Sequence, residues 1–232
     1  MLSDAELRTE LLRMTDAFTD ELFEYPDVAT VSFTATVSFP MSRLLVDVER
    51  FPNDTDEPMS RVGMGMVYTH TAHGQPLKRS LEPQERMHLL DYYAAHHRAL
   101  TDAVQAALEA QGKALIIDCH SFPSHPLPCD RDQIIPRPDF CIGTDAFHTP
   151  PELIQTVQTY LQETGHSVGL DWPYTGALVP LQFYQKDRRV ESIMIEVNRG
   201  LYMEEATGRK LPSFVCIQKH IQTLLRQMSR ES

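Results

Sequence analysis

The sequence lacks several features that would mark other classes of protein. None of its 232 residues lies in an apolar run long enough to cross a bilayer, a crossing that takes roughly 20 residues. The first residues, from Met1 to Asp4, show no basic segment followed by an apolar one, so no secretory signal peptide is expected. We therefore expect a cytoplasmic protein that does not act at a membrane.

Cysteine and positive charge are also scarce. The spacings of the four cysteines fit no zinc ribbon, and without a secretion signal free thiols are expected rather than disulfides; they are Cys119, Cys129, Cys141 and Cys216. Only 21 Lys and Arg oppose 32 Asp and Glu, which gives a net charge of −11. This excess of negative charge argues against nucleic acids and anionic membranes as partners.

The length and the ordinary apolar share of 42% predict one globular domain over residues 1–232. A capping box, Ser3 to Glu6, opens a helical pattern over residues 4–23, either one amphipathic helix or two short ones. Alternation over residues 31–39 predicts a strand, and a second extended run follows at 44–48.

The rest of the chain alternates helices with short apolar strands. Pro83 opens and Gly112 closes the longest helix, and the wholly apolar run 114–117 after it predicts a central strand covered on both faces. A long proline-rich loop is expected at 121–138. Further strands are predicted at 140–143 and 192–197, and further helices at 151–163 and 213–226. This order predicts a layered α/β fold.

Two polar residues stand out against these apolar runs. His120 follows the strand 114–118, at the carboxyl end where α/β sheets gather their ligands, so it is either a metal ligand or a histidine bonded to a loop carbonyl. Glu196 is a carboxylate inside an apolar strand. It is either a general base or half of an ion pair with an arginine such as Arg199.

Arg43 and Arg50 flank the extended segment 42–50. Guanidinium groups bind carboxylates with two parallel hydrogen bonds, so this pair would suit an acidic substrate. Pairing with the many local acidic residues is the simpler interpretation of the two arginines.

Four segments, in order, resemble the N-formylglutamate amidohydrolase family. They are SRLLVDVERF at 42–51, DCHSFP at 118–123, RPDFCIGT at 137–144 and IEVNRGLY at 195–202. The resemblance implies a three-layer α/β/α sandwich with a mixed central sheet, like that of zinc exopeptidases and aspartoacylases. It also implies hydrolysis of N-formyl-L-glutamate or a related small N-acyl acidic amino acid, with Zn²⁺ activating water for attack on the amide carbonyl.

The resemblance also implies roles for single residues. His120 and Asp16 would bind the metal, and Glu196 would transfer protons. The substrate carboxylates would be bound by Arg43, Arg50 and Arg137, although Glu49 stands before Arg50 where aspartoacylases have an asparagine. For Asp16 the helical phase predicts a solvated side chain, unless the helix breaks near Thr15.

The chain departs from the family pattern in one motif. The Pro-His-[Ser/Ala]-Gly motif that supplies another metal ligand in the family occurs nowhere in the chain. Three interpretations follow: the motif lies upstream of Met1, another ligand such as His70, His96 or His97 replaces it, or the metal has been lost. For His97, on the apolar face of the long helix, a core role is favoured.

The alternatives to deformylation are therefore an aspartoacylase-like or peptide amidohydrolase, or a non-catalytic protein that binds acidic metabolites. The sequence does not distinguish them, and it predicts no oligomeric state.

Overall fold

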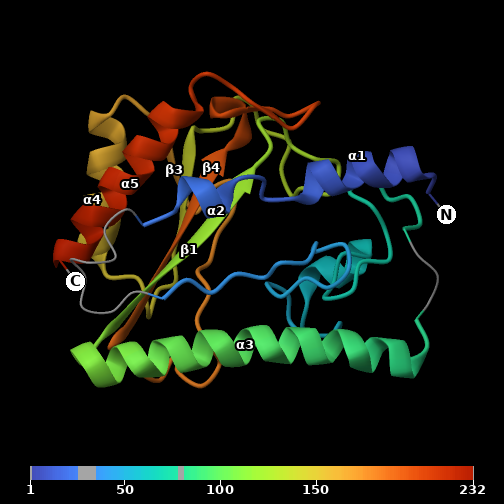
Figure 1. The fold of residues 1–232 in the computed structure, drawn as a ribbon, viewed down its shortest axis with the longest axis horizontal. Coiled ribbons are helices and arrows are strands. Elements are labelled where there is room, and N and C mark those ends of the chain that lie inside the picture. The colour runs from blue at the N-terminus through green and yellow to red at the C-terminus, as the bar shows by residue number, and fades with distance from the viewer. Residues whose placement is uncertain (1, 26–34, 78–80, 232) are drawn as a thin grey trace. The chain divides into compact units, whose positions relative to one another are not determined.

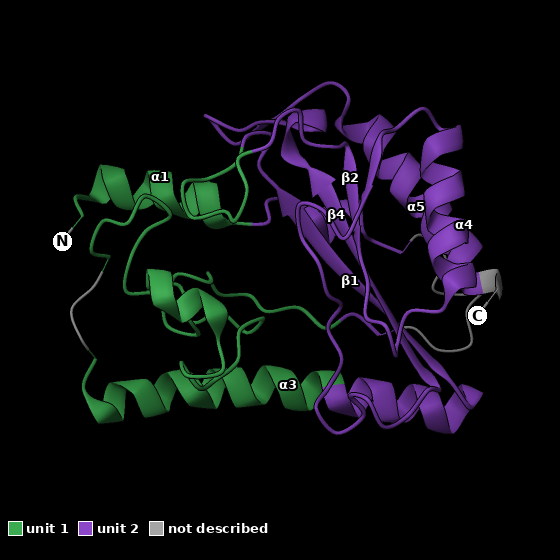
Figure 2. Ribbon diagram, turned by 180° about the vertical axis from the view of Figure 1, so that it is seen from behind, with its two compact units in different colours: residues 1–15, 37–100, 126–133 green, residues 16–36, 101–125, 134–232 purple. Residues whose placement is uncertain are grey.

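The computed structural model describes residues 2–25, 35–77 and 81–231. The chain divides into two compact units (Figure 2). Unit 1 comprises residues 1–15, 37–100 and 126–133, and unit 2 comprises residues 16–36, 101–125 and 134–232. The expectation of one domain over 1–232 stays a prediction.

Unit 2 is built on a mixed four-stranded sheet (Figure 1). Its strands, in spatial order, are β1 (Ala114–Phe122), β4 (Val190–Asn198), β2 (Phe140–Gly143) and β3 (Val168–Leu170). β1 and β4 are parallel, β2 is antiparallel to β4, and β3 is parallel to β2. The predicted α/β fold with a mixed sheet is confirmed.

The prediction that the run 114–117 forms a central strand is wrong for the sheet that the structure describes. β1 lies at the edge of this sheet and most of its residues are half-buried, whereas β4 is central and almost fully buried. A continuous apolar run indicates burial on both faces, but burial is also provided by packed loops and helices. It therefore does not determine the order of strands.

Helices surround this sheet. α4 (Pro151–Glu163) and α5 (Phe214–Glu231) lie side by side in both views (Figures 1 and 2). Their inward residues include Val157, Leu161, Ile221 and Leu224, each with no exposed surface. α4 also contacts β2 and β3, and the short α2 (Thr19–Leu22) contacts β1 and α5. Among the described residues, no helix is long and apolar enough to cross a membrane.

The sequence did not predict β3, the short helix η2 (Arg199–Leu201), or the hairpin of β5 (Met203–Glu204) and β6 (Arg209–Lys210). These elements have two or three residues each, too few for a periodic pattern to be recognised.

Unit 1 contains α1 (Asp4–Met14), η1 (Pro58–Val62) and the first part of α3 (Pro83–Gln111), whose last part belongs to unit 2. The capping box at Ser3 is present, and the predicted bounds of α3 are confirmed, with Gly112 in the left-handed conformation at φ 77°. Two apolar clusters, one around Tyr68 and one around Met66, form the core of this unit.

The first helical segment breaks at Thr15. α1 ends at Met14, and Thr15 is extended, with φ −83° and ψ 135°. Phe18 then takes a left-handed conformation ahead of α2. Of the two alternatives for residues 4–23, the pair of short helices is confirmed. Asp16 consequently lies outside both helices, and its orientation is not set by a helical phase.

The two early strands are not found among the described residues. Residues 31–34 of the first lie outside them, and 35–39 form no strand. In the second run, 44–48, Val46 and Val48 are buried, yet the segment is a loop. The Asp47 amide donates to the Met66 carbonyl (2.7 Å), and His97 Nε2 bonds the Val48 carbonyl (2.8 Å). Alternating burial is typical of a strand. Here a loop shows the same alternation, because its backbone groups form hydrogen bonds with Met66 and His97 and not with a neighbouring strand.

Candidate functional site

A row of polar side chains crosses the sheet of unit 2. His120 lies inside β1, not after its end as the sequence predicted, because the strand continues to Phe122. The pairing of β1 with β4 sets His120 beside Glu196, and the pairing of β4 with β2 sets Glu196 beside Cys141. Neighbouring residues across paired strands project from the same face, so these three side chains share one face.

The His120 imidazole lies between two carboxylates. Its Nε2 is 2.9 Å from Oδ1 of Asp118, two residues earlier on the same face of β1. Its Nδ1 is 3.5 Å from Oδ2 of Asp16. These two contacts are with acidic residues, and the alternative in which His120 also bonds a loop carbonyl stays a prediction.

Asp16 is held in place by Ser121 and Arg199. Its Oδ1 accepts hydrogen bonds from the backbone amide (3.0 Å) and the hydroxyl (3.1 Å) of Ser121, and Arg199 NH2 lies 3.4 Å away. Arg199 also donates to the hydroxyl (3.0 Å) and the carbonyl (3.1 Å) of Ser121. With Oδ1 occupied in this way, Asp16 turns Oδ2 toward His120.

The arginine of this network is the one that the sequence had offered as an ion-pair partner for Glu196. Arg199 is 5% exposed, and the bonds given above direct it to Asp16 and Ser121. Sequence analysis did not assign Arg199, Ser121 or Asp118 a role in the site. Asp118 and Ser121 lie within two residues of His120 in the chain, and this closeness in sequence could have indicated that they belong to the site.

Asp16 and His120 are arranged as two ligands of one metal ion would be. A tetrahedral zinc with donors at 2.0–2.2 Å separates two donor atoms by roughly 3.4 Å, close to the 3.5 Å between Oδ2 and Nδ1. Asp118, on the other ring nitrogen, matches the carboxylate that commonly orients a metal-binding histidine. The described part of unit 2 therefore offers two donors at a spacing that zinc could span, whereas catalytic zinc normally has three protein ligands.

Arg137 fastens the proline-rich loop. Its NH1 donates to the Pro123 carbonyl (3.3 Å) and to the Tyr174 hydroxyl (3.2 Å). The guanidinium also lies over the rings of Phe122 and Tyr174, 5.9 and 5.5 Å from their centroids. Arg137 is 7% exposed, so its contacts with the loop are buried. Its predicted contact with substrate stays a prediction.

Arg43 and Arg50 belong to unit 1. Arg50 Nε is 3.5 Å from Oδ2 of the buried Asp47, and the Tyr68 hydroxyl donates to the same oxygen (2.7 Å). The Tyr93 hydroxyl donates to the Arg50 carbonyl (3.0 Å). Arg50 is therefore held on a fixed loop, with part of its guanidinium engaged by an acidic neighbour, as the simpler interpretation expected.

The histidines suggested as replacement ligands also lie in unit 1. His97 bonds the Val48 carbonyl and stacks on Tyr93 at 4.2 Å between ring centroids, and burial lowers the pKa of this histidine. His70 Nδ1 is 2.9 Å from the Thr69 hydroxyl, and His96 packs edge-on against Phe39. These contacts are structural, and metal binding by any of the three stays a prediction.

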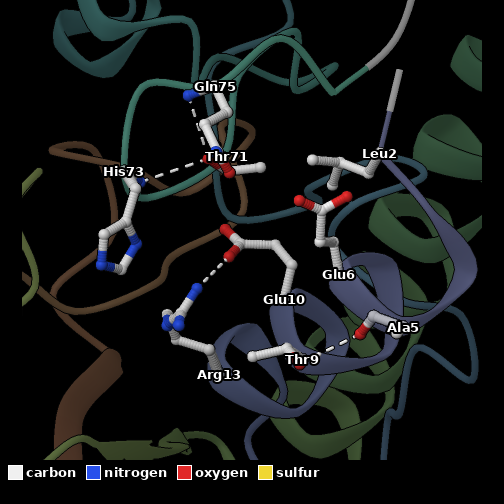
Figure 3. A pocket seen from close by; sticks show the side chains of 9 residues that line it. All are labelled: Leu2, Ala5, Glu6, Thr9, Glu10, Arg13, Thr71, His73 and Gln75. Atoms are coloured by element: carbon white, nitrogen blue, oxygen red, sulfur yellow. Dashed lines mark hydrogen bonds and ion pairs between the residues drawn. The ribbon is translucent and has the colours of Figure 1, made fainter.

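Unit 1 also contains a hollow of about 410 Å³ between α1 and the turn at 71–75 (Figure 3). Glu10, 2% exposed, extends into it and accepts a hydrogen bond from the Ala72 amide (2.7 Å). Its second oxygen pairs with Arg13. One carboxylate oxygen thus connects α1 to the turn at 71–75, while the other pairs within α1.

Neither cysteine near His120 and Glu196 is a thiolate. Cys119 stands between Asp118 and His120 on β1 and so faces the other side of the sheet; burial raises its pKa to about 12, and the adjacent Asp118 adds to the shift. Burial raises the pKa of Cys141 to about 12 as well, with the Glu196 carboxylate contributing. Both thiols stay protonated at neutral pH, which excludes them as nucleophiles. The chemistry of this face therefore rests on one imidazole and several carboxylates.

Fold and site together define a mixed-sheet α/β protein with a histidine–carboxylate centre on one face of its sheet. The sequence matches the N-formylglutamate amidohydrolase family over residues 2–203. Since this match spans most of the chain, the chain belongs to that family.

Two curated relatives are similar along most of their length. Over 206 residues, the chain is 30% identical to N-formylglutamate deformylase of Pseudomonas aeruginosa, covering 84% of this chain and 75% of that protein. It is 28% identical to N-formylglutamate deformylase of Pseudomonas putida over 240 residues, covering 97% and 88%.

Solved structures agree with the fold. The crystal structure of N-formylglutamate amidohydrolase from Ralstonia eutropha superposes with a TM-score of 0.78 at 25% identity, over 96% of this chain and 85% of that one. A gene product of Agrobacterium tumefaciens gives a TM-score of 0.55 at 16% identity, over 81% and 69%. The second likeness bears on the fold alone.

Replacing Arg199 with methionine should lower the free energy of unfolding by about 3 kcal/mol, because Asp16 would keep its charge without a cationic partner. The matched control is Arg189→Met, which breaks the pair with Asp187 on an arginine that is 62% exposed and should barely change stability. Urea unfolding of the three proteins measures the difference. Equal midpoints for both variants would contradict a structural role for the Asp16–Arg199 pair.

Thiol reactivity should follow exposure and pKa. At pH 8 a thiol with a pKa of about 12 is ionised in roughly one molecule in ten thousand, so Cys119 and Cys141 should not react with Ellman's reagent in the folded protein. The exposed Cys216 should react rapidly, and Cys216→Ser should remove that fast phase. Denatured protein, in which all four thiols react, is the reference. Fast reaction in a folded protein carrying both Cys129→Ser and Cys216→Ser would show that Cys119 or Cys141 is accessible.

Proposed function

We propose that this chain hydrolyses the amide bond of N-formyl-L-glutamate, or of a closely related N-acyl acidic amino acid, with zinc as its metal. The observation that carries the proposal is the juxtaposition of Glu196 with His120 across β1 and β4, next to an Asp16 that is fixed by Ser121 and Arg199. The names of the two Pseudomonas relatives agree with it.

Glu196 supplies the proton transfers in this proposal. Its carboxylate is 7% exposed and stands on the central strand of the sheet, so its position is set by backbone pairing on both sides. A carboxylate held in this way can accept a proton from the attacking water and then deliver it to the leaving nitrogen. Formate and the free amino acid are the products when the acyl group is formyl.

His120 and Asp16 would hold the metal, whose chemical contribution would be to polarise the amide carbonyl and to lower the pKa of water. Asp118 keeps the His120 ring oriented by bonding Nε2. Ser121 and Arg199 do the same for Asp16 by occupying its Oδ1. Three side chains thus support two proposed ligands, and little rearrangement is needed on binding.

Binding of the substrate carboxylates is assigned to Arg43, Arg50 and Arg137 through the family resemblance. Arg137 is the proposed contact in unit 2, where its loop is tied by Tyr174 and Pro123. For Arg43 and Arg50 the assignment rests on the motif at 42–51.

Glu196→Gln should lower kcat for N-formyl-L-glutamate by roughly 10²- to 10⁴-fold, since the amide keeps the shape of the side chain but cannot accept a proton. Glu191→Gln is the matched control, because it makes the same change in the same strand, five residues earlier, and should leave kcat close to that of the unmodified protein. Formate release measures both. Unchanged activity in both Glu196→Gln and His120→Ala would refute the proposed site.

A side-by-side assay of N-formyl-, N-acetyl- and N-succinyl-L-glutamate should give the highest kcat/KM for the formyl compound, because the acyl pocket has to accommodate only a hydrogen atom beyond the carbonyl. A higher kcat/KM for the acetyl or succinyl compound would support the proposed hydrolytic site but assign it a different substrate. Lack of turnover of all three by zinc-loaded protein would favour a protein that binds acidic metabolites without cleaving them.

A further inference from the structure

A second histidine cluster lies in unit 2, apart from the row that contains His120. His166 follows α4 and precedes β3, and His220 lies on α5. His166 Nε2 and His220 Nδ1 are 3.0 Å apart. The His166 ring packs edge-on against Phe140, which neighbours Cys141 on β2. Successive strand residues face opposite sides, so the pair lies on the other face of the sheet from His120 and Glu196.

Each ring has a polar neighbour at its outer nitrogen. Asp139 Oδ2 lies 3.9 Å from His166 Nδ1, and it is fixed there by the amide and hydroxyl of Ser167 at 2.9 and 3.0 Å. Cys216 Sγ lies 3.9 Å from His220 Nε2. A carboxylate behind one ring nitrogen is the usual arrangement for a histidine whose other nitrogen binds a metal.

The two inner nitrogens lie 3.0 Å apart, a distance at which one ring donates a hydrogen bond to the other. A cation that took the place of the shared proton would be bound by both nitrogens.

The donor set determines which ion would bind. Imidazole nitrogen and thiolate sulfur suit zinc and cobalt, while calcium and magnesium prefer oxygen. Cys216 stands one helical turn before His220 on α5 and is exposed; its sulfur lies 3.9 Å from Nε2 of His220, and as a ligand it would move from there toward the paired nitrogens. Asp139 is engaged by Ser167 and acts from behind His166.

We propose that His166, His220 and Cys216 form a binding site for a divalent transition metal such as Zn²⁺, on the face of the sheet opposite His120 and Glu196. Neither the family resemblance nor the proposed hydrolysis assigns these residues a role. The site is independent of the proposed function, since its three ligands take no part in that chemistry.

The test uses Co²⁺ as a spectroscopic probe in the full chain carrying His120→Ala, so that the proposed catalytic site does not contribute. This protein should bind cobalt and show the thiolate-to-cobalt absorption in the near ultraviolet. Adding Cys216→Ser should abolish that absorption and leave weaker binding. Adding His166→Gln or His220→Gln should weaken binding at least about tenfold, by analogy with the loss of metal-site partners.

The matched control adds His88→Gln instead, which removes an exposed histidine of α3 and should change neither affinity nor spectrum. Far-ultraviolet circular dichroism measures whether each variant is folded. If one of the two histidine variants is misfolded, the other still tests the proposal. A His120→Ala protein that binds no cobalt would overturn the proposal, as would a spectrum and affinity that both survive His166→Gln and His220→Gln.

Discussion

The candidate site depends on the fixation of Asp16 by Ser121 and Arg199. Asp16 comes from a break between two short helices, where the backbone alone would leave its side chain free to turn toward water. Three donors on Oδ1 hold it at β1 instead, and they leave Oδ2 directed at His120. The buried guanidinium of Arg199 is in turn satisfied by Asp16 and by the hydroxyl and carbonyl of Ser121. A charge buried in this way persists only with such partners.

Strand pairing places the other polar residues of the candidate site beside one another. His120 and Glu196 are 76 residues apart in the chain by their numbers, and the parallel register of β1 with β4 makes them neighbours. Backbone pairing positions side chains more rigidly than a loop does, which suits the proton transfer proposed for Glu196 beside the proposed ligand His120. The adjacent Cys141 stays a neutral thiol because burial raises its pKa, so the row has acid–base character without a competing nucleophile.

Much of this could be predicted from the sequence where the pattern is long or local. The bounds of α3 and α4 follow from Pro83, Pro151 and the terminal glycines, and the apolar runs indicate β1, β2 and β4. The sequence does not decide whether the helix breaks at Thr15, because apolar spacing continues through it. The apolar residues at 44–48 predict an extended run, although the segment is a loop whose polar groups bond Met66 and His97. Neither the role of Arg199 nor the edge position of β1 could be derived, because both depend on contacts between distant segments.

Zinc-edge anomalous diffraction from crystals grown with zinc is the direct test of whether Asp16 and His120 bind one metal ion, as proposed. An anomalous peak is expected within coordination distance of both Asp16 Oδ2 and His120 Nδ1, with Arg199 still bonded to Ser121. A peak that avoids both residues, or zinc bound by His120 while Asp16 points into solvent, would contradict it.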